Sequence, residues 1–139
     1  TLDKTLDIPA SILSKAKSLR DDLLNTTQQA VLLHGDLHHD NILKHGDAWL
    51  AIDPKGFIGD PAFELAAYLC NPIPALLEAN HAKKMLQQRI LQCADALGLS
   101  VTRIQDWLYV KSVLCWAWCV EDNLDASYLE KFLIQAFEI

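Results

Sequence analysis

Apolar residues recur every three to four positions along much of the chain, a spacing that predicts amphipathic helices. Residues 8–24 show it first, and the region of Pro9 or Ser11 can begin that helix, which Asn25-Thr26-Thr27 ends. The apolar face of this first helix consists of Ile12, Leu13, Ala16, Leu19, Leu23 and Leu24.

Further helices are predicted in the second half of the chain. One begins near Phe63 and is interrupted at residues 71–74, where the chain reads Asn-Pro-Ile-Pro. A long one runs through Met85 and ends at Gly98, a suitable C-terminal cap. Ser100 can cap the next, from Val101 to about Val120, and the last covers residues 128–137.

Short apolar runs between residues 30 and 52 have the character of strands. Residues 30–33 (AVLL) predict a buried strand, and a polar loop follows over residues 34–40. Residues 42–44 and 48–52 predict a hairpin around His45-Gly46-Asp47, and Asp53-Pro54-Lys55-Gly56 ends its second strand. The pattern therefore predicts an α+β fold that is mostly helical, with one small β-hairpin.

Composition narrows the class of protein only moderately. The chain has 139 residues, 51% apolar and 22% charged, which predicts a single soluble domain over residues 1–139. No apolar run is long enough to cross a bilayer and no signal peptide is visible, so a cytoplasmic location is expected. The missing initiator methionine suggests a piece of a longer chain. A net charge of −6 argues against nucleic-acid binding and is compatible with a cationic small-molecule substrate.

The four cysteines, Cys70, Cys93, Cys115 and Cys119, include no C-x-x-C pair. They are interpreted as buried, reduced thiols and not as a disulfide framework or zinc site. Cys115 and Cys119 are four residues apart on a predicted helix and could share a ligand, but no histidine lies nearby, so packing is preferred.

The stretch VLLHGDLHHDNIL (residues 31–43) holds the candidate chemistry. His34, Asp36 and His38 alternate, so on an extended segment they could face one side and bind a metal, as in a metal-dependent hydrolase. There is no H-E-x-x-H pattern, however, and His45 and His81 are interpreted as solvated surface residues. A polar loop without chemistry, with Asp36 as a capping residue, is the third possibility.

Phosphoryl transfer explains more of the sequence. His34-Gly35-Asp36-Leu37-His38-His39-Asp40-Asn41 resembles the protein-kinase catalytic loop H-R-D-L-x-x-x-N, with glycine in place of arginine. A hairpin follows, and Asp53 stands at the end of its return strand, where kinases carry a second metal-binding aspartate.

The loop also resembles the H-G-D-x-x-x-x-N motif of the aminoglycoside phosphotransferase family, small-molecule kinases with a protein-kinase-like fold. WLAIDPKGFIGDPAFELAAYL (residues 49–69) is similar to the streptomycin 6-phosphotransferase and hydroxyurea-resistance branch. The close resemblance covers about residues 31–72, and a looser one covers RIQDWLYVKSVLCWAWCVED (residues 103–122).

The resemblance implies ATP as phosphate donor and roles for five residues. Asp36 would accept or orient the proton of the acceptor hydroxyl. Asn41 and Asp53 would hold Mg²⁺ against the phosphates. His34 would fix the loop by hydrogen bonds, and Gly35 would meet a backbone requirement.

Other residues keep two interpretations each. His38 and Lys55 are either phosphate contacts or solvated loop residues. Asp60 braces the loop region or caps the helix near Phe63, with direct catalysis the weaker choice. Glu121 and Asp122 are either substrate-binding carboxylates or merely solvated. Of Trp116 and Trp118, one is expected in the core and the other could line a pocket.

The resemblance corresponds to the C-terminal lobe of such a kinase, since one helix before Val31 leaves no room for an N-terminal nucleotide-binding lobe. The chain alone is therefore expected to have little activity and could self-associate through the face that lobe would cover. A sugar or amino-alcohol kinase and a non-catalytic binding module that keeps the loop both stay open.

Overall fold

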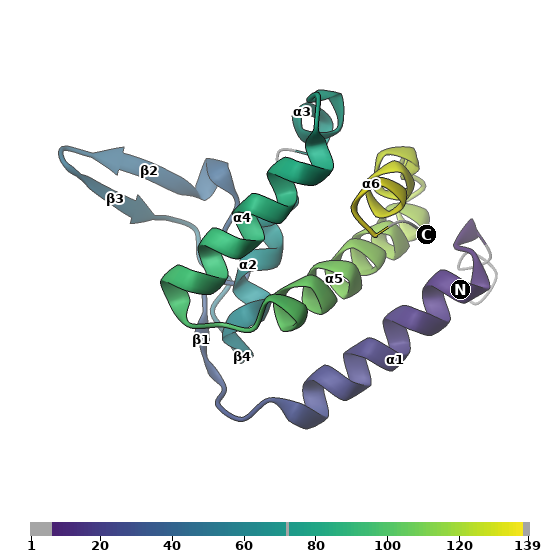
Figure 1. Cartoon of the computed structure of the whole chain (residues 1–139), viewed down its shortest axis with the longest axis horizontal. Coiled ribbons are helices and arrows are strands. Elements are labelled where there is room, and N and C mark those ends of the chain that lie inside the picture. Colours follow the sequence, from purple (N-terminus) through teal and green to yellow (C-terminus); the bar gives the residue numbers. More distant parts are fainter. Residues whose placement is uncertain (1–6, 72, 138–139) are drawn as a thin grey trace.

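The computed structural model describes residues 7–71 and 73–137, and within them the chain is mostly helical with four short strands (Figure 1). This confirms the predicted α+β class. The helices are α1 (Ala10–Thr26), α2 (Pro61–Leu69), α3 (Ile73–Glu78), α4 (Ala82–Leu97), α5 (Val101–Glu121) and α6 (Ser127–Phe137). None of the helices in the described part of the chain is both long and apolar enough to cross a membrane.

Helix α5 is the centre of the hydrophobic core, because α1, α2, α4 and α6 all pack against it (Figure 1). Its sequence is apolar on more than one side, as expected for a helix with neighbours on several faces. The most deeply buried apolar side chains come from α2, α5 and α6, and include Leu69, Ile104, Leu108, Tyr109, Leu129, Phe132 and Leu133.

The predicted helix ends are confirmed where capping residues signalled them. Ser100 is the N-cap of α5, and its hydroxyl oxygen accepts a hydrogen bond from the amide of Arg103 at 3.3 Å. Gly98 ends α4 with φ of +65°, a left-handed conformation that glycine adopts without strain. α1 begins after Pro9 and ends at Thr26.

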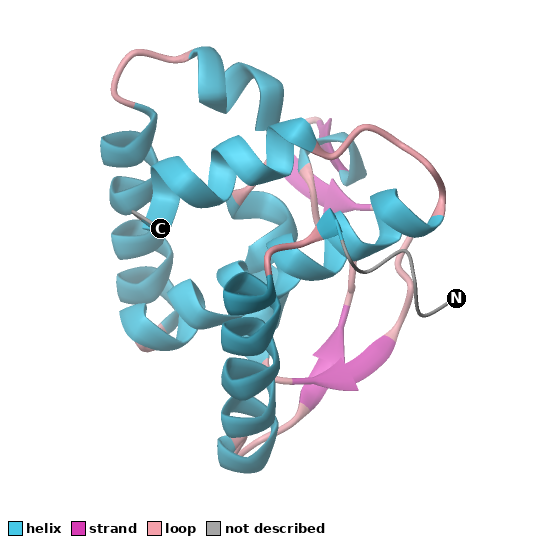
Figure 2. Cartoon of the chain, turned by 90° about the vertical axis from the view of Figure 1, so that its right-hand side faces the viewer, coloured by secondary structure: helices cyan, strands magenta, loops and turns pink. Residues whose placement is uncertain are grey.

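The strands form two separate antiparallel pairs. β2 (Ile42–His45) and β3 (Ala48–Ala51) make the predicted hairpin, which projects from the helical body (Figure 1). β1 (Val31–Leu33) pairs with β4 (Phe57–Gly59), a strand that the sequence pattern did not predict. Figure 2 shows that helices make up most of the molecule and that the two strand pairs are separate from each other, one of them partly behind the helices.

Three expectations about the pattern were wrong in part. Residues 31–33 form a strand, but it is not fully buried, since successive side chains point to opposite faces and Leu32 is 74% exposed. Leu24, assigned to the apolar face of α1, lies largely in solvent near the end of that helix. The interruption at residues 71–74 is shorter than expected because α3 starts at Ile73.

Candidate functional site: two loops around Asp36

Two loops on either side of the β2–β3 hairpin lie side by side and form the candidate site. The first follows β1 and ends in a short 3-10 turn, η2 (His39–Asn41), and the second, residues 52–56, joins β3 to β4. The carbonyl oxygen of His34 accepts hydrogen bonds from the amides of Lys55 at 2.8 Å and Gly56 at 3.3 Å. At the other end the amide of Ile52 donates to the carbonyl of Asn41 at 2.9 Å. The backbone therefore fixes both ends of the loop pair.

The ring of His34 lies between these loops and holds the first one in shape. Its Nε2 lies 2.6 Å from the carbonyl oxygen of Ile52, and its Nδ1 lies 3.2 Å from the amide of Asp36. Because an amide can only donate, Nδ1 accepts and the neutral ring carries its proton on Nε2. The ring thus connects the carbonyl group of Ile52, in the second loop, to the backbone amide of Asp36, in the first.

Glu64, in the first turn of α2, is a part of the site that sequence reasoning missed. Its two carboxylate oxygens accept hydrogen bonds from the amides of His34 at 2.6 Å and Gly35 at 2.9 Å. A charged acceptor makes such bonds stronger than neutral pairs. The only local signal was an acidic residue just after the Gly-Asp-Pro turn, which could not reveal a partner thirty residues earlier.

Gly35 has a backbone requirement that only glycine meets easily. Its φ is +86°, and a Cβ atom at this position would lie 2.3 Å from Cε1 of Phe57 on β4. That phenyl ring also packs against Phe63, with 5.8 Å between the ring centroids. The loop therefore passes under Phe57 because residue 35 has no side chain.

We expect Gly35→Ala to lower the free energy of unfolding by about 2–4 kcal/mol, because left-handed strain is added to displacement of the Phe57 ring. Gly46→Ala is the matched control, since Gly46 also has positive φ (+58°) but a Cβ atom there would meet nothing within 4 Å beyond its chain neighbours. It should cost only about 1–2 kcal/mol. Urea unfolding of both variants measures the difference, and equal losses would contradict the close contact.

The carboxylate of Asp36 faces two nitrogen groups. Its Oδ2 lies 3.7 Å from Nε2 of His38 and 3.9 Å from Nζ of Lys55, and about a third of the side chain is exposed. His38 Nδ1 lies 3.2 Å from the amide of Asp40, which can only donate to it, so a neutral His38 ring carries its proton on Nε2. The structure thus brings Asp36, His38 and Lys55 together.

Asn41 and Asp53 occupy adjacent positions on the paired loops. Asn41 is buried, and its Nδ2 donates to the carbonyl of Asp36 at 2.8 Å. This hydrogen bond uses the amide nitrogen, which leaves the amide oxygen for a ligand. Asp53 is exposed at the end of the ladder, with φ of +55°, a conformation that aspartate tolerates better than most residues.

An amide oxygen and a carboxylate are hard oxygen donors of the kind that Mg²⁺ prefers when it also keeps water and phosphate ligands. The donor set therefore fits magnesium. A histidine-rich metal site, the alternative considered from the sequence, finds no support, because the described residues contain no group of three or more His, Cys, Asp or Glu side chains able to hold an ion. His45 and His81 are exposed, as predicted.

Asp36 lies at the meeting point of two hollows. The first, which we call the Lys55 hollow, has a volume of about 510 Å³ and is lined by Gly35, Asp36, Lys55, Phe57, Phe63, Lys111, Leu114 and Trp118. The second, the Tyr128 hollow, has a volume of about 410 Å³ and is lined by Asp36, Ala67, Cys70, Asn71, Ile73, Lys111, Ser112, Cys115, Trp118, Tyr128 and Leu129. Asp36, Lys111 and Trp118 line both hollows.

The wall of the Tyr128 hollow is largely uncharged apart from Asp36 and Lys111. Burial raises the pKa of the Cys70 thiol to about 12, and burial together with the nearby Cys119 raises the pKa of Tyr128 to about 12. Burial also raises the pKa of Cys115. These groups are therefore protonated at neutral pH. All four cysteines are free of disulfides, as predicted, but only Cys70 is buried, because Cys93, Cys115 and Cys119 lie on helix sides that are partly open to solvent.

The two tryptophans near the end of α5 separate as expected. Trp116 is buried in the core, whereas Trp118 is 47% exposed and lines both hollows. Glu121 and Asp122 are exposed at the C-terminal end of α5 and line neither hollow. A substrate-binding role for these two carboxylates stays a prediction.

Asp60 is a structural connection between three helices. It is the N-cap of α2, where Oδ1 accepts from the amide of Ala62 at 3.0 Å. Its Oδ2 accepts from Nε of Arg103 at 2.5 Å and from Nε1 of Trp107 at 2.7 Å. The same Arg103 guanidinium donates to the carbonyl of Leu23 at 2.8 Å, so α1, α2 and α5 are tied at one point.

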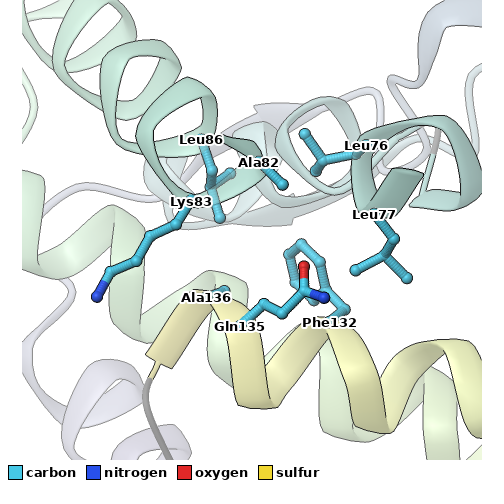
Figure 3. A pocket seen from close by; sticks show the side chains of 8 residues that line it. All are labelled: Leu76, Leu77, Ala82, Lys83, Leu86, Phe132, Gln135 and Ala136. Atoms are coloured by element: carbon cyan, nitrogen blue, oxygen red, sulfur yellow. The ribbon is translucent and has the colours of Figure 1, made fainter. Parts of the chain in front are cut away.

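A further small gap between α3, α4 and α6 belongs to the packing and not to the site (Figure 3). Its volume of about 10 Å³ is at the lower limit for one water molecule. Figure 3 shows aliphatic side chains and Phe132 meeting there, with polar ends only from Lys83 and Gln135 among the residues that line it.

Comparison with known proteins gives relatives of one kind. The chain is 33% identical over 123 residues to a streptomycin 3''-kinase of Klebsiella pneumoniae, covering 80% of this chain and 43% of the relative. It is 31% identical over 96 residues to a streptomycin 6-kinase of Streptomyces griseus, covering 68% and 31%. Identity to a hydroxyurea phosphotransferase of Kitasatospora aureofaciens is 38% over 93 residues, covering 66% and 25%.

The chain thus spans less than half the length of each of these relatives. No solved structure matches the chain significantly. A family model described as aminoglycoside/hydroxyurea antibiotic resistance kinase matches residues 6–123, which include both loops and the hollows' walls on α2 and α5. The chain therefore belongs to the aminoglycoside/hydroxyurea antibiotic resistance kinase family.

Proposed function

We propose that this chain contributes the acceptor-binding and catalytic part of an ATP-dependent phosphotransferase, whose acceptor is a hydroxyl group of an aminoglycoside-like antibiotic of the streptomycin type. The observation that carries the proposal is the position of Asp36 at the junction of two hollows, on a loop whose end at Asn41 is hydrogen-bonded through the backbone to Ile52, the residue before Asp53. Membership of the antibiotic resistance kinase family supports it.

In the proposed reaction the acceptor hydroxyl lies in the Tyr128 hollow and Asp36 accepts its proton. The hydroxyl oxygen then forms a bond to the γ-phosphorus of ATP, while the bond from that phosphorus to the bridging oxygen breaks and ADP leaves with the electron pair. Asp36 later releases the proton to solvent. In this arrangement the phosphate donor, ATP, and the acceptor hydroxyl lie on opposite sides of the Asp36 carboxylate.

Asn41 and Asp53 would hold Mg²⁺ through the amide oxygen and the carboxylate. The bound ion supplies neutralisation of negative charge on the phosphate oxygens. Lys55 and His38 add donors close to Asp36, and we propose that both contact the phosphates. Trp118 and Tyr128 line the Tyr128 hollow, where they would contact the acceptor.

We further propose that residues 1–139 form one domain that corresponds to the C-terminal lobe of a protein-kinase-like fold. Because the relatives it matches are more than twice as long, this lobe by itself should have little activity. ATP turnover by the isolated chain at the rate of the whole protein would contradict this part of the proposal.

We expect Asp53→Ala to abolish magnesium-dependent nucleotide binding in the protein that contains this chain, because one of two proposed oxygen ligands is removed. Asp47→Ala in the exposed hairpin turn is the matched control and should bind nucleotide normally. Calorimetric titration with ATP, with and without Mg²⁺, measures the effect. Unchanged magnesium-dependent binding in Asp53→Ala would count against the assignment, and absence of nucleotide binding in the wild type would favour a non-catalytic module.

A further inference from the structure

Lys111 is a lysine on α5 that the motif did not include and that lies at the same junction as Asp36. Its side chain lines both the Lys55 hollow and the Tyr128 hollow. Its Nζ is 5.0 Å from the centroid of the Trp118 ring and 5.6 Å from that of Phe63. Two aromatic faces thus hold the ammonium group beside the place where donor and acceptor would meet.

The charges around the Lys111 ammonium group favour the binding of an anion beside it. None of the ion pairs within 4.0 Å in the described part of the chain includes Lys111. The Lys55 hollow contains two ammonium groups, Lys55 and Lys111, and only one carboxylate, Asp36, with which Lys55 is already paired. The thiols and the phenol of the Tyr128 hollow are protonated at neutral pH and cannot neutralise it.

We propose that Lys111 is a catalytic residue that binds the phosphoryl group while it passes from ATP to the acceptor hydroxyl. This rests on the proposed function. As the bond from the γ-phosphorus to the ADP oxygen breaks and the bond to the acceptor oxygen forms, negative charge spreads over the three oxygens of the transferring group. Lys111 donates N–H groups to one of these oxygens from the side of α5, opposite the loop that carries Lys55.

A purely structural role is the competing explanation, because a lysine on an aromatic face also stabilises packing. The chain offers a comparison for it. Lys15 on α1 lies with Nζ 4.6 Å from the centroid of the Tyr109 ring, but it lines neither hollow. Lys15→Met therefore removes the same charge and the same type of contact at a distance from Asp36.

The test uses the protein that contains this chain, as wild type and as Lys111→Met, Lys111→Arg and Lys15→Met variants. We expect Lys111→Met to lower kcat for phosphate transfer about 10²-fold or more, the size seen when one preorganised donor is lost, with KM for the acceptor little changed. Lys111→Arg should recover at least part of this loss, and Lys15→Met should retain full activity. Melting temperatures separate these effects from instability.

A second readout does not depend on turnover. Titration with inorganic phosphate, followed by ³¹P NMR, should show binding that is about tenfold weaker in Lys111→Met than in the wild type and unchanged in Lys15→Met, as expected for loss of one charge-assisted contact. Unchanged phosphate binding or unchanged kcat in Lys111→Met would overturn the proposal. If the wild type transfers phosphate to no acceptor, the proposed function fails and the phosphate titration alone decides about Lys111.

Discussion

Asp36→Asn should lower the rate of phosphate transfer about 10²- to 10⁴-fold, the range typical for loss of a general base, while nucleotide binding stays nearly unchanged. Asparagine keeps the shape of the side chain but cannot accept a proton from the acceptor hydroxyl. The loop itself should persist, because its geometry depends on His34, Glu64 and Asn41 through backbone groups that the substitution does not alter.

Asp40→Asn is the matched control for this experiment. Asp40 lies four residues later in the same loop and is exposed, and its contact with His38 uses the backbone amide. Steady-state kinetics with ATP and the acceptor, together with ATP titration, measure both variants. Equal rates for Asp36→Asn and Asp40→Asn would mean that Asp36 is not the proton acceptor.

Asp60→Ala should lower the free energy of unfolding by about 3–5 kcal/mol, the usual cost of breaking a buried ion pair by removing one partner. The side chain of Asp60 is only 4% exposed, and its removal leaves the Nε–H of Arg103 and the Nε1–H of Trp107 without an acceptor. The N-cap of α2 is lost as well. Urea unfolding of the variant measures the loss.

Asp125→Ala provides a control for loss of a capping aspartate without a buried ion pair. Asp125 accepts from the amide and the hydroxyl of Ser127, but it is exposed. Its replacement should shift the urea midpoint far less than Asp60→Ala. Similar shifts for the two variants would show that capping, and not the connection to Arg103 and Trp107, accounts for the effect.

The contribution of Asp60 should also depend on pH. Burial acts to raise the pKa of Asp60, but hydrogen bonds from Trp107, the Ala62 amide and Arg103 together hold it below the ordinary value of 3.8. Because the pKa is lower in the folded state than in the unfolded state, the ionised carboxylate stabilises the fold at every pH above the ordinary pKa. This stabilisation is lost as the pH falls through the folded-state pKa. The stability difference between wild type and Asp60→Asn should therefore shrink below about pH 4.

Local sequence signals predicted those parts of the fold that local interactions determine. Ser100 and Gly98 marked helix ends because capping involves residues within one turn. The β2–β3 hairpin was visible because Gly46 and Asp47 separate two apolar runs. The β1–β4 pair was not, since three residues are too few to show a period and the two strands are far apart in sequence.

The sequence predicted those residues of the candidate site that belong to one local motif. It did not predict the residues that tertiary contacts bring to the site. His34, Asp36, Asn41 and Asp53 followed from one loop and the hairpin after it. Glu64 and Lys111 approach from α2 and α5, and their positions depend on helix packing that no local pattern encodes. The one available signal for Lys111 was an isolated lysine within the apolar segment DWLYVKSVLCWAWCV.

The measurement that tests the central claim most directly is mass spectrometry of an acceptor panel, consisting of streptomycin, sugars and amino alcohols, after incubation of each with ATP, Mg²⁺ and the protein that contains this chain. The account predicts streptomycin with one phosphate ester on a hydroxyl group, formed together with an equal amount of ADP. A sugar or amino alcohol as the phosphorylated product would keep the mechanism and change the acceptor. ADP formation without any phosphate ester across the whole acceptor panel, or no consumption of ATP, would contradict phosphate transfer to a hydroxyl group.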